Sequence, residues 1–496
     1  MGTLAIGIGA LLICTAGYLL AFRQFSNRRI QTALLILMGC GLLLRIHTAS
    51  DPYLHPWDER YHALVAKNLM QHPLKPVLYD EPILDFDHRN WTGNHVWLHK
   101  QPVPLWTMAL SMSLFGVNEL ALRIPSILLT TLGIWITFAI GRYLFNSRVG
   151  FIAAFFYSIH GLIIELSAGR VATDHVDIFL LFFIQLGVLL AIEFARSRKV
   201  YFNLLCGISI GLAILSKWLP ALIVIPIWLL LVLDSGKFNT REILLNLGLL
   251  CITTLVVFLP WQIYIHLAFP EEAAWESHYN RLHIFEGLGG QGRPFHYHFN
   301  NARILFGEIV YLPLVWLFWK SFKKWRNLKR MLLTTWILVP FIFFSFASTK
   351  MQAYVLFTAP AIFIATALFW HYLYVFRNRF RFRWIPWLIL FLLIALPVRY
   401  SLERIKPFTR TESRPSWVDV LKNVDVDGKN SVIFNVDFPI EAMFYTDFIA
   451  YEGIPDRKIL ESIVEEGYSV YINKTGLADD SIRAPGSVTF IELPGD

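Results

Sequence analysis

The sequence has 496 residues, of which 55% are hydrophobic and only 16% charged, and its mean hydropathy is +0.50. These values exclude an ordinary soluble protein and indicate a chain that lies mostly within a membrane. The net charge of +8 calls for no nucleic-acid partner, because most Lys and Arg residues lie in short loops between apolar runs, where they orient a membrane protein. The four cysteines lie inside apolar runs and show no metal or disulfide spacing.

Apolar runs long enough to cross a membrane recur along the chain. A bilayer core about 30 Å thick needs roughly 20 apolar residues in a helix. The runs predict about twelve spans, near residues 2–22, 31–49, 121–145, 149–168, 175–195, 201–216, 219–233, 243–267, 302–319, 331–349, 352–376 and 384–400. The first run has no basic residues before it, so we expect a retained helix and not a signal peptide. The predicted fold class is an all-α polytopic membrane protein, with a transmembrane domain over residues 1–402.

Clusters of basic residues fall on alternate connections between these spans. They lie at residues 23–29, 196–199, 320–330 and 377–383. The positive-inside rule places these connections in the cytoplasm. We therefore expect both termini, two large external loops at residues 51–120 and 268–301, and the chain after Ser401 on the opposite side of the membrane.

Two external segments have a structure that the sequence indicates. The apolar stretch 104–115 is too short to span and predicts a helix lying along the membrane surface. Beyond the last span the composition changes, and strands are expected at residues 431–436, 469–473 and 488–491, with helices at 439–446 and 455–467. These elements predict a small external α/β domain over residues 403–496.

Acidic residues stand at the external ends of two predicted helices. Asp58 and Glu59 follow the second span directly, and Asp174 and Asp177 open the fifth. A solvated helix start is the plain alternative for the first pair, because carboxylates favour the first turn of a helix. For Asp174 the alternative is a structural ion pair with Arg170, four residues earlier.

Four basic residues lie on the external side at membrane level, against the topological rule. They are Lys100, Lys217, Arg281 and Lys350. A cation near lipid is costly unless it is paired, so a bound anion is the default hypothesis, with snorkelling to the interface as the alternative for any one of them. Together with the external carboxylates, the four cations predict a site where a phosphorylated membrane lipid is held and a proton is removed.

In this order the residues resemble a known family. The series consists of Asp58-Glu59, Lys100-Gln-Pro102, Leu114-Phe-Gly116, Arg123, Thr173-Asp174, Ser216-Lys217, Leu259-Pro-Trp261, His278 with Arg281, and residues 344–354 around Lys350. Over residues 50–370 the chain resembles the polyprenyl-phosphate-sugar-dependent glycosyltransferases of the GT-C superfamily, in the branch of the lipid A 4-amino-4-deoxy-L-arabinose transferases and protein O-mannosyltransferases. His99 and His62 depart from the arabinose transferase pattern, which commonly has Glu and an aromatic residue there.

The resemblance implies a membrane glycosyltransferase that acts on the periplasmic face of the bacterial inner membrane. Its donor would be a sugar on undecaprenyl phosphate or a similar lipid, and its acceptor a glycolipid such as lipid A or a protein. Asp58 is the candidate base, Glu59 a second base or an orienting partner, and Asp174 a residue that positions the sugar or a basic partner. Lys100, Arg281, Lys350 and Lys217 would bind the donor phosphate.

The sequence leaves metal binding open. His99 and His278 match positions that can hold a divalent cation in the family, although an imidazole site usually needs a third ligand. No nucleotide cofactor is expected, because no phosphate-binding glycine loop occurs.

The alternative function is a secondary transporter, which would also have about twelve spans, but transporters usually show internal repeats and midplane charges.

Overall fold

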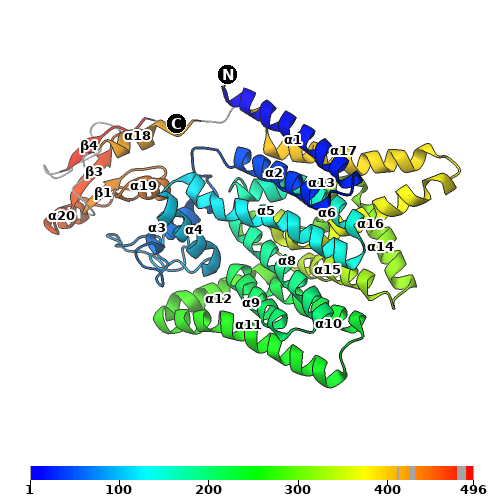
Figure 1. The fold of residues 1–496 in the computed structure, drawn as a ribbon. Coiled ribbons are helices and arrows are strands. Elements are labelled where there is room, and N and C mark those ends of the chain that lie inside the picture. The colour runs from blue at the N-terminus through cyan, green and yellow to red at the C-terminus, as the bar shows by residue number, and fades with distance from the viewer. Residues whose placement is uncertain (1, 410–412, 425–429, 478–487, 495–496) are drawn as a thin grey trace. The chain divides into compact units, whose positions relative to one another are not determined.

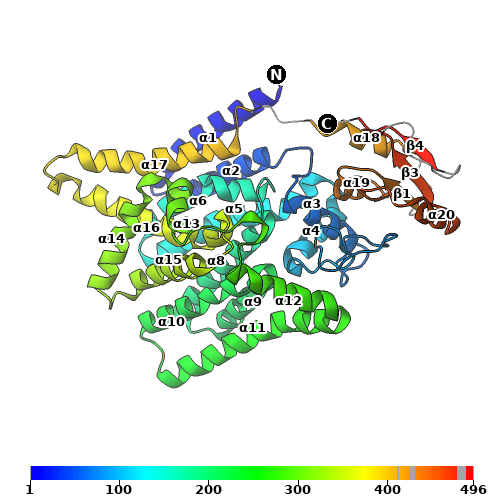
Figure 2. The ribbon, with the colours of Figure 1, turned by 180° about the vertical axis from the view of Figure 1, so that it is seen from behind.

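A computed structural model describes the whole chain apart from residues 1, 410–412, 425–429, 478–487 and 495–496. The chain forms two compact units (Figures 1 and 2). The first comprises Met1–Ser50, Lys100–Pro104 and Ser126–Arg410, and the second Asp51–His99, Leu105–Pro125 and Thr411–Asp496. The second unit therefore combines most of the predicted loop 51–120 with most of the predicted C-terminal domain. Parts of that domain, including residues 478–487, lie outside the described residues.

The first unit is helical. Its helices are α1 (Gly2–Ser26), α2 (Ile30–Thr48), α6 (Ser147–Ile159), α7 (Gly161–Ser167), α8 (Asp174–Ser197), α9 (Val200–Lys217), α10 (Val224–Ser235), α11 (Thr240–Ala268), α12 (Pro270–Phe285), α13 (Tyr297–Phe306), α14 (Tyr311–Lys323), α15 (Leu328–Phe346), α16 (Ala359–Phe376) and α17 (Trp384–Ile405). Short 3-10 turns join some of them: η1 (Leu219–Ile223), η2 (Leu288–Gly290), η3 (Glu308–Val310), η4 (Gln352–Thr358) and η5 (Arg377–Arg379). Helix α5 (Glu119–Leu144) begins in the second unit and continues into the first.

All twelve predicted runs are helical, which confirms the all-α membrane fold, but the count of about twelve spans is not confirmed. Within the described residues, nine helices are long and apolar enough to cross a membrane, or up to eleven if two bent pairs each count as one span. Helices α6 and α7 bend by 51° and α13 and α14 by 115°. The second break lies at Gly307, whose φ of 90° suits a residue without a Cβ atom. The run at 219–233 is a 3-10 turn followed by the short helix α10.

The external loop expected at 268–301 contains a helix that was not predicted from the sequence. Helix α12 starts with Pro270 and carries Glu271 and Glu272 in its first turn. Proline at the first position and carboxylates in the first turn both favour a helix start. The signal was therefore present in the sequence.

Small residues allow α9 and α11 to approach closely in the first unit. Gly207 and Gly211 of α9 form a G-x-x-x-G pattern. A Cβ atom on Gly207 would stand 2.9 Å from the carbonyl oxygen of Leu250, and one on Gly211 would stand 2.6 Å from Cβ of Val257. The two helices can pack at this distance only because both positions lack a side chain.

The second unit has an α/β core, as predicted. Its four strands are parallel and lie in the order β2 (Ile449–Ala450), β1 (Ser431–Phe434), β3 (Ser469–Asn473) and β4 (Thr489–Ile491). Its helices are α3 (Asp58–Leu69), α4 (Pro102–Phe115, which begins in the first unit), α18 (Ser416–Lys422), α19 (Pro439–Tyr445) and α20 (Arg457–Glu465). The three predicted strands and two predicted helices of the C-terminal segment are confirmed. Strand β2, which has only two residues, and helix α18 were not predicted from the sequence.

We predict that Gly207→Ala destabilises the protein by about 1–3 kcal/mol, the usual cost of overpacking a well-packed contact. The added methyl group meets the backbone oxygen of Leu250, which cannot rotate away as a side chain can. Thermal unfolding of the purified protein in detergent measures the effect. Gly248→Ala is the matched control, because Gly248 lies on α11 and a methyl group added there would meet nothing within 4 Å. Equal melting temperatures for the two variants would contradict the packing argument.

Candidate active site

Glu59 is a structural residue of the second unit. Its carboxylate is fully buried and accepts from Arg123 at both oxygens, with Nε at 2.7 Å and Nη2 at 2.9 Å. The guanidinium of Arg123 also donates to the carbonyl oxygens of Asp51 and Tyr53, each at 2.6 Å. The backbone N–H of His55 donates to the same carboxylate at 2.8 Å. The ion pair thus fixes the segment that leads into α3, which favours the orienting role for Glu59.

Asp58 is the accessible carboxylate of the acidic pair. It is the first residue of α3 and is half-buried, whereas Glu59 is 0% exposed. Neighbouring residues on a helix point about 100° apart, so one can face the interior while the other faces outward. Burial raises the pKa of Tyr61, and the nearby charge of Asp58 contributes to the rise. This position suits the predicted base, although the role itself stays a prediction.

In the first unit the predicted cation Lys217 is paired with Asp177. The ammonium donates to Oδ1 of Asp177 at 2.6 Å, and the carboxylate is almost fully buried. Thr173 donates to the other oxygen of Asp177. The Lys217 ammonium also lies 4.7 Å from the ring centroid of Tyr354. Asp177 is therefore the partner of a predicted site residue; it was not selected from the sequence, although it stands in the acidic cluster with Asp174.

The predicted site residue Asp174 lies inside the first unit, where its side chain is 0% exposed. It is the first residue of α8, and its Oδ1 accepts from the backbone N–H of His175. Arg170 donates to the carbonyl oxygens of Arg404 at 3.5 Å and Ile405 at 3.2 Å. Asp174 thus contributes to the start of α8, and a role in positioning the sugar stays a prediction.

Lys100 and Lys217 come from distant segments but act on the same histidine. Burial lowers the pKa of His283 on α12, and the charges of Lys100 and Lys217 lower it further. Both cations are half-buried. Lys100, Lys217 and His283 all belong to the first unit, and convergence of the four cations stays a prediction.

Arg281 lies on the same helix, at the edge of a large apolar pocket of the first unit. The pocket measures about 820 Å³. Most of its wall is apolar, from η1, α10, α15 and η4, and its polar residues include Ser277, Asn280, Arg281 and His283 of α12. Positions 277, 280, 281 and 284 share one helix face by their spacing. Arg281 is exposed and donates a hydrogen bond within its own helix, to the carbonyl oxygen of Ser277.

Lys350 is placed differently from the other predicted cations. Its side chain is 3% exposed, and its ammonium donates to the carbonyl oxygens of Arg293, at 2.9 Å, and Ala347. An ammonium has three donors, so two are used by the backbone. The backbone N–H of Lys350 donates to Gln291 at 3.0 Å, beside an antiparallel bridge between Gly292 and Thr349. Lys350 thus ties two loops together, and its predicted phosphate contact stays a prediction.

The two histidines of the metal hypothesis lie in different units. His99 belongs to the second unit and stacks on Trp91, with ring centroids 4.6 Å apart. His278 belongs to the first unit and is exposed on α12. Among the described residues, no group of three or more His, Cys, Asp or Glu side chains has the arrangement of a metal site. The metal stays a prediction that lacks a third ligand.

Known proteins share both sequence and fold with this chain. Residues 99–264 match the family described as dolichyl-phosphate-mannose-protein mannosyltransferase. An undecaprenyl phosphate-alpha-4-amino-4-deoxy-L-arabinose arabinosyl transferase of Pseudomonas fluorescens is 27% identical in an alignment that covers 54% of this chain and 48% of the relative. An uncharacterised protein of Aquifex aeolicus is 28% identical over 63% of this chain and 58% of its own length. The chain thus spans about half the length of the curated relatives that it matches.

Solved structures of glycosyltransferases have a fold similar to that of this chain. ArnT from Cupriavidus metallidurans bound to undecaprenyl phosphate has a TM-score of 0.58 at 15% identity, over 87% of each chain. The oligosaccharyltransferase AglB from Archaeoglobus fulgidus, in complex with an inhibitory peptide and a dolichol-phosphate, has a TM-score of 0.55 at 16% identity, over 84% of this chain and 64% of AglB. The chain is similar in sequence to these glycosyltransferases and shares the fold of ArnT and AglB. It is a multi-pass membrane protein, and these comparisons favour the predicted glycosyltransferase over the alternative of a secondary transporter.

We predict that Glu59→Gln and Arg123→Met each lower the free energy of unfolding by about 3–5 kcal/mol, because each leaves one buried charge without its partner. Chemical denaturation of the purified protein measures the loss. The double variant Glu59→Gln with Arg123→Met should lose less than the sum of the two, since no unpaired charge is left.

The exposed pair Arg457–Glu461 gives the matched control in the same unit. Glu461→Gln should change the free energy of unfolding by about 0–1 kcal/mol. If Glu59→Gln costs no more than Glu461→Gln, the buried pair does not hold the segment in place.

Proposed function

We propose that this protein transfers a sugar from a polyprenyl-phosphate donor to an acceptor on the outer face of the bacterial inner membrane. The donor lipid would be of the undecaprenyl-phosphate type, and the acceptor a glycolipid or a protein. The resemblance of the ordered residues, the shared fold and the names of the relatives support the proposal.

The apolar pocket of the first unit is the observation that carries the proposal. A volume of about 820 Å³ is at the upper end of the range for small-molecule sites, which is about 300–1,000 Å³. Its wall is built from Trp218, Leu219, Pro220, Leu222, Ile223, Pro226, Ile284, Val339, Pro340, Phe343, Phe344, Ala347, Tyr354 and Phe357, together with the polar residues of α12 and Thr349. A chain of isoprene units is purely apolar and would gain free energy from burial against such a wall. The exposed guanidinium of Arg281 on α12 would bind its phosphate.

The charges around this pocket suit a phosphodiester. Asp177 pairs with Lys217, and Arg281 and Lys100 would supply positive charge to the donor phosphate. The lowered pKa of His283 keeps that imidazole neutral near pH 7, where it can donate or accept a hydrogen bond without adding charge. A cation that meets the growing charge of the leaving phosphate stabilises the transition state more than the ground state.

The transfer exchanges one C–O bond for another and moves one proton. The acceptor oxygen bonds to the anomeric carbon while the bond from that carbon to the phosphate oxygen breaks, and the polyprenyl phosphate leaves with both electrons. Asp58 takes the acceptor proton. The family resemblance leads us to expect inversion at the anomeric carbon. The reaction as written uses no nucleotide, and a divalent metal at His99 or His278 stays a separate prediction.

We predict that Arg281→Gln weakens the binding of polyprenyl phosphate about tenfold or more, because a hydrogen bond to a charged group is worth about 1.5–3 kcal/mol. Titration of the lipid into protein in nanodiscs, followed by intrinsic fluorescence, measures the affinity. Arg241→Gln is the control, since Arg241 is an exposed arginine at the opposite, cytoplasmic end of α11 in the predicted topology. Equal affinities for the two variants would remove Arg281 from the donor site.

We also predict that Asp58→Asn lowers transfer at least about 10²-fold, the usual contribution of a general base, while donor binding is retained. Mass spectrometry of lipid A, surface glycolipids and secreted glycoproteins, with and without the gene, identifies the product that lacks one sugar. Returning the wild-type gene should restore the missing sugar, and returning the Asp58→Asn variant should not. The control Asp85→Asn changes a carboxylate of the same loop outside the acidic pair and should restore it fully. Normal product with Asp58→Asn would leave Asp58 as a helix start only.

A further inference from the structure

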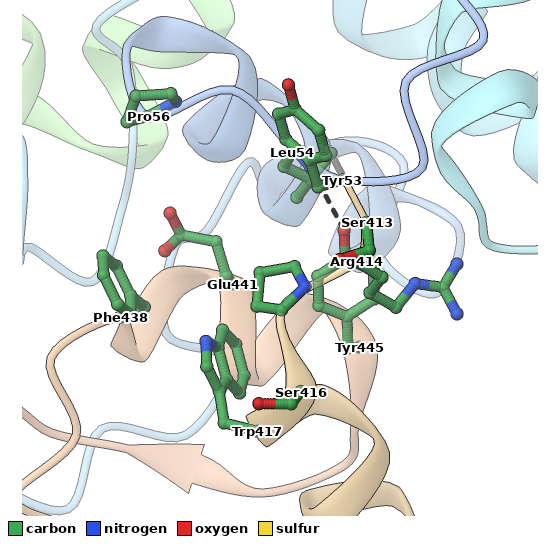
Figure 3. A pocket seen from close by; sticks show the side chains of 11 residues that line it. Tyr53, Leu54, Pro56, Ser413, Arg414, Ser416, Trp417, Phe438, Glu441 and Tyr445 are labelled. Carbon is green, nitrogen blue, oxygen red and sulfur yellow. Dashed lines mark hydrogen bonds between the residues drawn. The ribbon is translucent and has the colours of Figure 1, made fainter. Parts of the chain in front are cut away.

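A second cavity lies wholly within the second unit and has no part in the donor site described above. It measures about 440 Å³ (Figure 3). Its walls come from the segment before α3 and from the C-terminal part of the chain: Tyr53, Leu54, Pro56, Ser413, Arg414, Pro415, Ser416, Trp417, Phe438, Glu441 and Tyr445. We call it the loop pocket. It combines aromatic rings with hydroxyl groups and with two residues of opposite charge, Arg414 and Glu441.

One wall of the loop pocket is aromatic and carries an unused donor. The rings of Trp417 and Phe438 are nearly parallel, at 9°, with centroids 6.0 Å apart. Trp417 is 5% exposed, and its indole N–H has no hydrogen-bond partner among the residues that the structure describes. Because buried donors are almost always satisfied, this N–H is suited to a bound ligand or water.

A buried carboxylate lines the same cavity. Glu441 is 6% exposed, and Figure 3 shows its side chain beside the rings of Trp417 and Phe438. Arg60 donates to its Oε1 at 3.1 Å and forms an ion pair with it, and a carboxylate has about four sites that accept hydrogen bonds. The cavity thus offers a strong acceptor and a donor next to a flat apolar face.

The part of the lining formed by Tyr445 and Arg414 is held by a hydrogen-bond network. The hydroxyl of Tyr445 accepts from the backbone N–H of Leu54 at 3.1 Å, the contact dashed in Figure 3, and donates to Glu119 at 2.8 Å. Arg414 donates to Glu119 at 3.2 Å and to the carbonyl oxygen of Pro52 at 3.2 Å. Burial raises the pKa of Tyr445, and the charge of Glu119 raises it further, so the hydroxyl keeps its proton. The wall is therefore preformed.

The loop pocket adjoins the candidate base. Pro56, which lines it, precedes Asp58 by two residues, and two residues span at most about 7 Å. The Glu59–Arg123 pair fixes the same segment. A molecule in the loop pocket would therefore lie close to Asp58.

We propose that the loop pocket binds a sugar ring of the acceptor, and hence that the acceptor is a glycolipid or another glycan. This inference rests on the proposed function. A sugar ring has an apolar C–H face that packs on an indole and hydroxyl groups that donate to a carboxylate and accept from an N–H. A peptide acceptor would be expected along a strand edge or a groove, whereas this cavity is lined by α18, α19 and loops.

Binding of methyl β-D-glucopyranoside and methyl N-acetyl-β-D-glucosaminide to the full-length protein in nanodiscs tests the proposal. Saturation-transfer NMR measures the affinity of each. At least one glycoside should bind saturably, and Trp417→Phe and Glu441→Gln should each weaken it about tenfold or more. Trp325→Phe and Glu461→Gln are the matched controls, since Trp325 is largely exposed, Glu461 is partly exposed, and neither residue lines the cavity. Melting temperatures identify any variant that does not fold.

Hydrolysis of the donor by water, with no acceptor present, is measured on the same samples. Pocket variants that keep this hydrolysis but lose glycoside binding support the loop pocket. Wild-type protein without any donor turnover counts against the proposed function, whatever the glycosides do. Two results would overturn the loop-pocket proposal itself: no saturable binding of either glycoside up to tens of millimolar, or binding that a Ser/Thr-containing peptide displaces and that Trp417→Phe leaves unchanged.

Discussion

The buried ion pair between Glu59 and Arg123 is the constraint on which the second unit depends. Two full charges without water are costly, and the pair is stable only because backbone groups satisfy the remaining donors and acceptors. Those backbone groups belong to the segment directly before α3. The same interaction therefore sets the position of Asp58, which follows the segment, and of Pro56, which lines the loop pocket. One electrostatic contact thus determines where a base and a ligand cavity can lie.

In the first unit the corresponding constraint is the cost of cations near lipid. The ammonium of Lys217 is stabilised by Asp177 and the ring of Tyr354, and that of Lys350 by two carbonyl oxygens. Arg281 instead remains exposed beside a large apolar pocket. The structure thus distinguishes two kinds of basic residue that cannot be told apart in the sequence. Those with internal partners build the fold, whereas an exposed cation beside an apolar wall is suited to a lipid phosphate.

The sequence predicts the apolar helices well, although not the number of spans, because hydropathy is local and needs no knowledge of the fold. It misses the breaks at His160 and Gly307, since these depend on backbone angles. It identifies the pair Asp58 and Glu59 but does not distinguish which is buried, because the partner Arg123 is 64 residues away. The pairing of Asp177 with Lys217 was not predicted for the same reason, because the two residues are 40 positions apart. The loop pocket is the least predictable feature, since its walls meet only after folding, and no spacing between Leu54 and Trp417 indicates it.

The second unit is assembled from stretches of chain that are made at very different times. Leu54 bonds to Tyr445, 391 residues later. At about 5–20 residues per second, the ribosome needs about 20–80 s to pass from one to the other. Throughout that interval the apolar residues Tyr61, Leu64 and Trp97, which are buried in the finished unit, lack the C-terminal residues that complete their core. Biogenesis of this protein therefore includes an interval of tens of seconds in which the second unit is half-formed, and we expect its uncovered apolar residues to be open to quality-control proteases.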